Sequence, residues 1–395
     1  MITTNDFERE EQLKRWLSFL EQDPQNGHLI NSIFESALIV NNIDVLQHML
    51  DHIKEQQLSD PQVNRMASLV SLQLGKFPEA ISFSQHVLGT EFENTTVLHN
   101  LAYAQLYMNQ YEQAYLTLQP LMSSSALVEA DTYVLYARIL HHLEQPAGAI
   151  ASLRNAINLN PRHAEALGNL ALLQYETNNN FSDYLNVKET AQQALAINPY
   201  QFEALLALGE VQLNERSISA AQNTFNLILE HYPQAGRAWS GLGQLEFYEM
   251  NLEKAEQHLL KAVEYMNNHV GTWHVLAWCY ILKQDIANAE KAFEISLPLN
   301  TEFADSYGGL AVVEAMKNNV SKSKQLIQQA YDIDEHSMAA QYAEYVLLNN
   351  ANQANAAQQK MNNILIKRAP SSESSGQVLV QDWLSNHPNF QKHLN

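Results

Sequence analysis

Two histidines, His48 and His52, are spaced four residues apart, which would place two imidazole rings on one face of a helix, where they could hold a metal ion. The sequence shows no third ligand at a suitable distance from them, and a single pair of this kind arises easily by chance. His141 and His142 are adjacent, so their side chains would diverge on a helix. We therefore predict neither a metal site nor a cofactor.

Cys279 is the only cysteine, which excludes an intrachain disulfide and a cysteine-based zinc cluster. It falls within the apolar run WHVLAWCYIL, where a buried inert thiol is the better interpretation than a reactive one. The sequence contains no GxGxxG or GxxxxGK[ST] phosphate-binding loop, and no HExxH, GxSxG or EF-hand pattern. We predict that the protein is not an enzyme.

The charge balance restricts the partners. The chain has 43 acidic and 23 basic residues and a formal net charge of −20, which disfavours nucleic acid and favours, if anything, a basic partner. The first residues, MITTNDFEREEQLKRW, lack the apolar run of a secretory signal, and no run of apolar residues is long enough to insert into a membrane. We predict a cytoplasmic location.

The elements that position all these residues recur with a period of about 34 residues. Within each unit apolar residues follow the helical spacing i, i+3, i+4, i+7 twice, separated by short polar breaks such as QLGKF at 73–77 and HLEQP at 142–146. Strand signals are absent, so we predict an all-α solenoid of about nine to ten antiparallel helix pairs. The units begin near Gly27, Pro61, Thr95, Ala130, Ala164, Phe202, Gly236, Val270, Ala304 and Met338.

These units resemble tetratricopeptide repeats, in which small residues let the paired helices approach and large residues fill the gaps between pairs. The resemblance implies a right-handed superhelix whose first helices line a concave face, where partners usually bind. The residues that carry it are Trp239, Leu242, Gly243 and Ala255; Trp273, Leu276, Ala277, Tyr280, Ala289 and Phe293; and Leu205, Leu208, Gly209, Ala221, Phe225 and Pro233.

The repeat pattern decays toward both ends, as terminal repeats with wetter outer faces should. Residues 1–26 are predicted to form an N-terminal capping helix with Phe19 and Leu20 facing inward, and 27–369 to form the repeat array. Extra residues in NNNFSDY, 178–184, form either a tolerated loop or a turn offered to a partner. Residues 370–395 are a linker and tail, whose end is a capping helix, a motif that docks on a partner or on the chain's own groove, or disordered.

The resemblance also implies which side chains face the groove, namely those at the second, fifth, ninth, twelfth and thirteenth places of a unit. Aromatic and arginine side chains there offer large contact areas and hydrogen bonds, although each could instead be a partly buried packing residue. The predicted partner-binding residues are His99, Tyr103, Tyr107, Arg138, His142, Tyr175, Glu210, Arg237, Gln244, Tyr248, His274 and Trp278.

Two specialised versions of the family are not expected. Members that bind the C-termini of heat-shock chaperones carry a clamp of Lys and Asn, and members that serve protein-glycosylating enzymes carry a ladder of asparagines. The clamp positions here hold His99, Tyr103, Leu135, Glu165 and Asn169, and only Asn100 and Asn169 occupy ladder positions.

We therefore predict a non-enzymatic scaffold or adaptor that holds a peptide or helix of a partner protein in its concave groove. Assembly of a bacterial secretion, pilus or envelope machine is one context, and the alternative is a regulatory or targeting subunit of an enzyme complex. The sequence does not indicate an oligomeric state.

Overall fold

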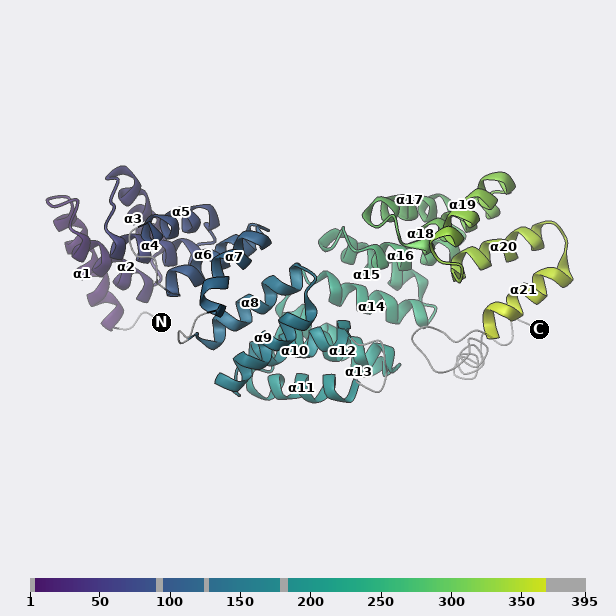
Figure 1. Cartoon of the computed structure of the whole chain (residues 1–395), viewed down its shortest axis with the longest axis horizontal. Coiled ribbons are helices and arrows are strands. Elements are labelled where there is room, and N and C mark those ends of the chain that lie inside the picture. Colours follow the sequence, from purple (N-terminus) through teal and green to yellow (C-terminus); the bar gives the residue numbers. More distant parts are fainter. Residues whose placement is uncertain (1–3, 90–94, 124–127, 178–183, 367–395) are drawn as a thin grey trace. The chain divides into compact units, whose positions relative to one another are not determined.

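All the regular secondary structure of the described residues is helical, which confirms the predicted fold class. The computed structural model describes residues 4–89, 95–123, 128–177 and 184–366, and within these ranges it has α-helices, one short 3-10 helix and no strand (Figure 1). The helices are α1 (Thr4–Leu20), α2 (Gly27–Ile39), α3 (Ile43–Glu55), α4 (Pro61–Gln73), α5 (Phe77–Leu88), α6 (Thr95–Tyr107), α7 (Tyr111–Ser123), α8 (Ala130–His142), α9 (Pro146–Leu159), α10 (Ala164–Thr177), α11 (Tyr184–Ile197), α12 (Phe202–Asn214), α13 (Ile218–His231), α14 (Gly236–Tyr248), α15 (Leu252–Tyr265), α16 (Val270–Leu282), α17 (Ile286–Ser296), η2 (Leu297–Leu299), α18 (Ala304–Met316), α19 (Val320–Ile333), α20 (Met338–Asn350) and α21 (Ala354–Ile366).

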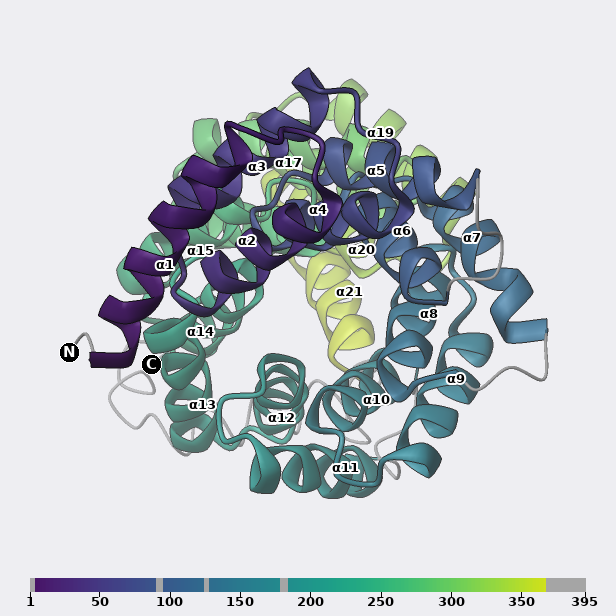
Figure 2. The same ribbon diagram turned by 90° about the vertical axis from the view of Figure 1, so that its left-hand side faces the viewer.

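The helices pack as pairs. Even-numbered helices from α2 to α20 begin at the ten unit starts named above, and most of them pack extensively against the helix that follows. First helices of successive pairs also touch, α4 against α6 and α12 against α14 for example. In Figure 2, α4, α6 and α8 lie in one layer and α5, α7 and α9 in another. We call the surface formed by the even-numbered helices, which are the first helices of their pairs, the first-helix face.

The chain divides into two compact units, Met1–Leu173 and Gln174–Asn395. The boundary falls inside α10, so that most of this helix belongs to the first unit, while Tyr175 and Glu176 near its end belong to the second. Each unit is a stack of helix pairs and has its own sites, which are described separately below.

In nine of the ten helix pairs the turn inside the pair lies within the described residues, and it holds one residue in the left-handed conformation. Its φ lies between 52° and 69°, and the next residue donates its N–H to a carbonyl five residues earlier, as Gln145 does to Leu140 at 2.9 Å. This hydrogen bond closes the first helix. Gly and Asn tolerate the left-handed conformation, but several turns place other residue types there. The left-handed residues of these turns are Asn41, Gly75, Asn109, Glu144, Arg216, Met250, Gln284, Asn318 and Asn352.

Replacing Glu144 by Gly should raise the free energy of unfolding by about 0.5–1 kcal/mol, because glycine adopts the left-handed conformation without a Cβ clash. Glu144 is exposed with φ 56°, so the substitution removes no buried contact. Urea denaturation followed by circular dichroism measures the change. Asn41→Gly, at φ 52°, is the matched control and should change stability less; equal effects of the two substitutions would contradict the explanation.

The core of each unit consists of apolar residues from both helices of every pair. Phe225 on α13 is fully buried, and its ring lies against Gly209 of α12 and Gly241 of α14. A Cβ added at Gly241 would be 2.4 Å from this ring, and one added at Gly209 would be 2.8 Å from it. The large residue thus fills the gap between two successive first helices, as the repeat pattern predicts.

The N-terminal helix differs from its prediction in one residue. Leu13 and Leu20 of α1 are buried and pack with Trp16 and Leu17 into the core formed with α2 and α3. Phe19 is 53% exposed, so the expectation that it faces inward is wrong. Positions 13, 16, 17 and 20 form one helical stripe, and position 19 falls outside it.

Cys279 is fully buried, as predicted, and its thiol donates a hydrogen bond to the carbonyl of Leu252 at 3.3 Å. Burial raises the pKa of the thiol to about 11, which keeps it protonated and unreactive. Residues 178–183 and 370–395, which carry the predicted insertion and tail, lie outside the described residues. Among the helices described, none combines the length and the apolar character needed to cross a membrane.

The paired histidines His48 and His52 have different surroundings. His52 Nε2 lies 2.7 Å from the carbonyl oxygen of Pro24, so its ring ties α3 to the turn before α2, and His48 is exposed. In the described part of the chain no three His, Cys, Asp or Glu side chains converge on a point where an ion could sit.

Candidate partner-binding face

A row of aromatic rings follows α6 on the first-helix face of the first unit. His99, Tyr103 and Tyr107 are spaced by four residues, and their ring centroids are 6.5 and 4.8 Å apart. Phe77 of α5 extends the row by stacking on Tyr107 at 4.9 Å. Tyr107 is 44% exposed. The sequence placed three of these residues in the binding set, and the structure brings them together.

Arg138 of α8 joins this row to the next helices. Its guanidinium carbon lies 5.6 Å from the centre of the Tyr107 ring, a cation–π distance, and Nη2 is 3.4 Å from the Tyr107 hydroxyl. Its Nη1 is 3.9 Å from Glu165 Oε1 on α10. Burial acts to raise the pKa of Tyr107, but hydrogen bonds from Arg138 and Tyr103 outweigh it and lower that pKa. Burial, with the hydrogen bond to Tyr107, raises the pKa of Tyr103 to about 12.

A cavity of about 230 Å³ lies beside the aromatic row. His99 Nδ1 is 3.0 Å from the Thr132 hydroxyl, and burial lowers the pKa of His99, so the ring is neutral near pH 7. The cavity is lined by aromatic rings, apolar side chains and charged groups. Its lining residues are His99, Tyr103, Asp131, Val134, Leu135, Arg138 and Glu165.

His142 lies apart from this cavity. Its ring is exposed and stacks on Tyr111 with centroids 4.4 Å apart and planes only 3° from parallel. Burial, together with His141 and Arg138, lowers the pKa of His142. It is an accessible side chain at the end of α8, outside the group around Tyr103.

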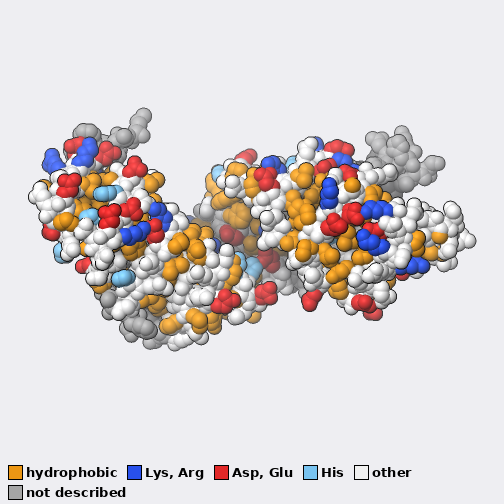
Figure 3. Space-filling view, turned by 90° about the horizontal axis from the view of Figure 1, so that it is seen from above, with side chains coloured by type: hydrophobic (Ala, Val, Ile, Leu, Met, Phe, Trp, Pro, Cys, Tyr) orange, Lys and Arg blue, Asp and Glu red, His pale blue; other side chains and the backbone are white. Residues whose placement is uncertain are grey.

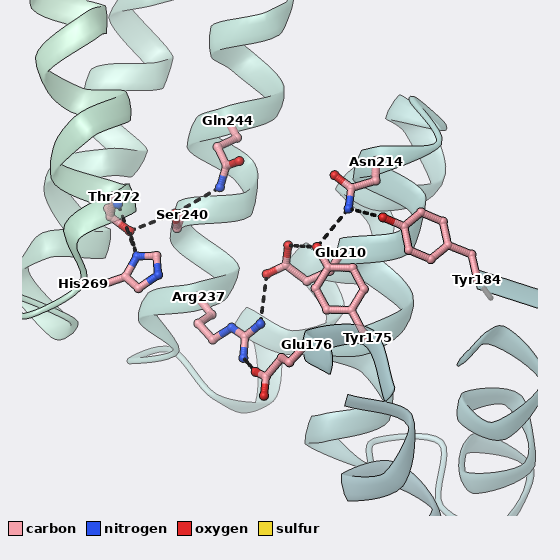
Figure 4. A network of polar contacts seen from close by, with 10 residues as sticks. All are labelled: Tyr175, Glu176, Tyr184, Glu210, Asn214, Arg237, Ser240, Gln244, His269 and Thr272. Atoms are coloured by element: carbon pink, nitrogen blue, oxygen red, sulfur yellow. Dashed lines mark hydrogen bonds and ion pairs between the residues drawn. The ribbon is translucent and has the colours of Figure 1, made fainter. Parts of the chain in front are cut away.

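The first-helix face of the second unit carries a polar network centred on Arg237 of α14 (Figure 4). Arg237 Nη1 lies 2.5 Å from Glu176 on α10, and Nη2 lies 3.5 Å from Glu210 on α12. The other oxygen of Glu210 accepts a hydrogen bond from the Tyr175 hydroxyl at 3.5 Å. Burial raises the pKa of Glu210, an effect that Arg237 and Tyr175 oppose. Residues far apart in sequence thus meet because successive helix pairs place their first helices in the same layer.

Asn214, at the end of α12, fixes two tyrosines of this network. Its amide nitrogen donates to the Tyr175 hydroxyl at 2.9 Å and to the Tyr184 hydroxyl at 3.0 Å. Burial raises the pKa of both phenols well above pH 7, so both hydroxyls are protonated. Tyr175 can then accept from Asn214 while it donates to Glu210.

His269 closes the network at the start of α16. Its Nδ1 accepts a hydrogen bond from the backbone N–H of Thr272 at 3.2 Å, which caps the helix, and it lies 2.9 Å from the Thr272 hydroxyl. Because Nδ1 accepts, the ring hydrogen of the neutral form sits on Nε2. Burial and the charge of Arg237 lower the pKa of His269, which favours this neutral form.

These groups surround a cavity of about 410 Å³, which we call the Glu210 cavity. Sequence analysis identified four of its residues. It did not select Glu176, although this residue is at the thirteenth place of its unit, and it missed His269, which precedes the first residue of α16. The cavity is lined by Tyr175, Glu176, Glu210, Arg237, Ser240, Gln244, Met266 and His269.

Three further predicted residues of the second unit lie elsewhere. Tyr248 is 49% exposed at the end of α14. Trp278 is half-buried and packs edge to face on Phe293 and Tyr342. His274 is only 7% exposed, and its Nε2 lies 2.8 Å from the Ser306 hydroxyl. We therefore treat it as a packing residue and exclude it from the binding face.

Basic side chains are interspersed with acidic ones. On the face seen in Figure 3, Lys and Arg lie beside Asp and Glu and form no large patch of their own. Such pairs often join successive helices, as Lys283 does with Glu256 and Lys317 with Glu290, both at 2.5 Å. On this face the described side chains form no extended basic track for a phosphate backbone.

Comparison with known proteins agrees with this architecture. Tetratricopeptide repeat models match residues 130–163 and 206–269. The chain is 26% identical over 160 residues to the general transcriptional corepressor ssn6 of Schizosaccharomyces pombe, covering 40% of this chain and 14% of that protein. It is 22% identical over 177 residues to the BBSome complex member BBS4 homolog of Drosophila melanogaster, covering 45% of this chain and 36% of that protein. The chain therefore spans much less than two thirds of either relative.

Among solved structures, a tetratricopeptide repeat protein from Parabacteroides merdae superposes with a TM-score of 0.47 at 15% identity, covering 68% of this chain and 98% of that one. Stacked helix pairs of this length, with side chains of successive first helices meeting on one face, define a helical-repeat protein. The matched stretches, residues 130–163 and 206–269, are therefore tetratricopeptide repeats.

Proposed function

We propose that this protein is a non-catalytic scaffold that binds extended or helical segments of partner proteins on the first-helix face of each unit. The observation that carries the proposal is the composition of that face. In both units it gathers tyrosine and arginine side chains from successive first helices around a cavity, of about 230 Å³ in one unit and 410 Å³ in the other.

Aromatic and arginine side chains are the residue types that dominate binding energy at protein interfaces. Here they are held in place before a partner arrives. Tyr107 is fixed between Phe77 and Arg138, and Arg237 is fixed by two carboxylates. A preorganised surface loses little conformational entropy on binding, so the ordering cost falls mainly on the partner. A role in a bacterial secretion, pilus or envelope machine remains a prediction from the sequence.

The test begins with peptides selected by phage display on the full chain, whose dissociation constants are then measured by fluorescence anisotropy. One variant carries Tyr103, Tyr107 and Arg138 changed to Ala, and the other carries Gln244 and Tyr248 changed to Ala. We expect each selected peptide to bind at least one of the two variants about 30-fold more weakly, the loss of about 2 kcal/mol typical of interface anchors.

The control variant changes Leu116 and Leu185 to Ala. Both side chains are 61% exposed on second helices, α7 and α11, away from the first-helix face. It should bind every peptide like the unmodified protein, and all variants should keep their helical circular dichroism. The proposal would be refuted if a peptide bound both first-helix variants as tightly as the unmodified protein, or if only the control variant bound it more weakly.

A further inference from the structure

The Glu210 cavity holds more carboxyl groups than cations. Arg237 is its one permanent cation among the lining residues, and it contacts the carboxyl groups of both Glu176 and Glu210. His269 adds no charge, because its Nδ1 accepts the capping hydrogen bond from Thr272 and its ring is neutral. The cavity therefore has an excess of one carboxyl group.

Glu210 is the group whose charge is least compensated. Its side chain is only 15% exposed, and its contacts with Arg237 and Tyr175 are both 3.5 Å long, at the outer limit of a hydrogen bond. Glu176, in contrast, holds Arg237 at 2.5 Å. Removing a carboxylate from water is unfavourable unless nearby charges and donors replace the lost hydration. A second cation placed in the cavity would supply the missing compensation.

An anion would have the opposite effect. A carboxylate or phosphate that approached Arg237 would meet Glu176 and Glu210, which already occupy the guanidinium. Arg237 alone would suggest an acidic ligand, but its two partners remove that role.

The remaining walls suit a long side chain that ends in a cation. Met266 provides a polarizable apolar surface for an aliphatic stem. Gln244 donates its amide hydrogen to Ser240 at 3.3 Å, which leaves its carbonyl oxygen to accept (Figure 4). The volume of about 410 Å³ lies within the usual range of ligand pockets. The net charge of −20 attracts basic segments over a longer range.

We infer that the Glu210 cavity binds a lysine or arginine side chain of the partner segment, with Glu210 as the principal acceptor. This inference rests on the proposed function, since it gives the chemistry of the segment that the second unit takes. It concerns the second unit alone.

The test uses small probes that contain only the side chain in question. Nα-acetyl-arginine amide and Nα-acetyl-lysine amide are titrated into the full chain labelled with ¹³C-methyl methionine, with Nα-acetyl-glutamine amide and Nα-acetyl-glutamate amide as comparison probes. Met266 lines the cavity, and its methyl signal is assigned from a Met266→Leu variant. We expect the two basic probes to shift this signal and the neutral and acidic probes to leave it unchanged.

Two variants have opposite predicted effects. Glu210→Gln should weaken binding of the basic probes about fivefold or more, and Arg237→Gln should strengthen it, because two carboxyl groups lose their competing cation. General disruption of the cavity would weaken binding in both variants. Glu264→Gln, at a side chain 54% exposed on α15, is the control and should change nothing.

Equal shifts with neutral or acidic probes, or weaker binding in both cavity variants, would overturn the inference. The proposed function is judged separately by the selected peptides. The selected peptides could bind the first-helix face and yet need no basic residue and bind the Glu210→Gln variant normally. In that case the function stands and the inference fails. If basic probes bind through Glu210 while no peptide depends on the face, the function fails and the cation site stands.

Discussion

Replacing Phe225 by Ala is expected to lower the free energy of unfolding by about 3–5 kcal/mol, the usual cost of removing a buried aromatic ring from a packed core. The ring is fully buried and fills the space between Gly209 of α12 and Gly241 of α14. Because each helix pair is stabilised only by its neighbours, a cavity here should weaken the contact between successive pairs as well as the pair itself.

Gly241→Ala offers a matched test of the same contact. Its new Cβ would be 2.4 Å from the Phe225 ring, so the substitution alone should cost about 1–3 kcal/mol by overpacking. In the double variant the ring is gone and the methyl group occupies part of the space it leaves. The cost of Gly241→Ala should then largely disappear, giving a strong coupling between the two positions.

Urea denaturation followed by circular dichroism gives the stabilities, and amide hydrogen exchange in α12 to α14 shows whether the loss is local. Far-UV spectra should stay helical in all three variants. If Phe225→Ala cost less than about 1 kcal/mol, or if the two substitutions were additive, the ring would not be the packing element between these helices.

Most of the fold was predictable because the same pattern of small and large packing residues recurs in successive repeats. The spacing of Gly209 and Phe225 locates both helices of one pair and the gap that the aromatic ring fills, and the period then transfers this result along the chain. The polar breaks marked the turns, but not their left-handed residue. Glu144 and Met250 occupy that position although neither residue type favours it, since the hydrogen bond that closes the helix determines the backbone there.

The candidate site was predictable only in part. The position of a residue within its repeat identified Tyr103, Arg138 and Arg237 as residues of the first-helix face, because the direction of a side chain depends on local helix geometry. Their partners depend on contacts between units. That Arg237 meets Glu176, 61 residues earlier, decides whether its charge is available, and no local pattern contains this information.

His274 shows the same limit. It occupies the fifth place of its unit, which the family pattern directs toward a partner, yet the next pair covers it. Phe303 packs edge to face on the imidazole with centroids 4.8 Å apart, and the Ser306 hydroxyl of α18 lies 2.8 Å from its Nε2. A rule that considers one unit at a time cannot detect burial by the next.

Burial of His274 should make stability depend on pH between about 6.5 and 4. Burial lowers the pKa of His274 from 6.5 to about 4. In this range the unfolded chain binds a proton that the folded chain cannot, so stability falls as the pH falls and is unaffected by this group above pH 6.5. The shift corresponds to a loss of about 3 kcal/mol by pH 4.

The comparison that isolates this effect is the unmodified protein against His274→Gln, with the free energy of unfolding measured by urea denaturation from pH 7 to pH 4. Carboxylates that do not interact with His274 are common to both proteins, so their effect cancels in the difference; the charge of Asp305, which raises the pKa of His274, is already included in the shift to about 4. The variant should be less stable at pH 7, where it lacks the imidazole's packing on Phe303, but it should lose about 3 kcal/mol less on acidification. His336→Gln, at a side chain 72% exposed, should follow the unmodified protein at every pH. The explanation would be wrong if the difference in stability between His274→Gln and the unmodified protein stayed constant from pH 7 to pH 4. The folded chain would then protonate His274 as readily as the unfolded chain does, and the imidazole would be open to solvent and available to a partner.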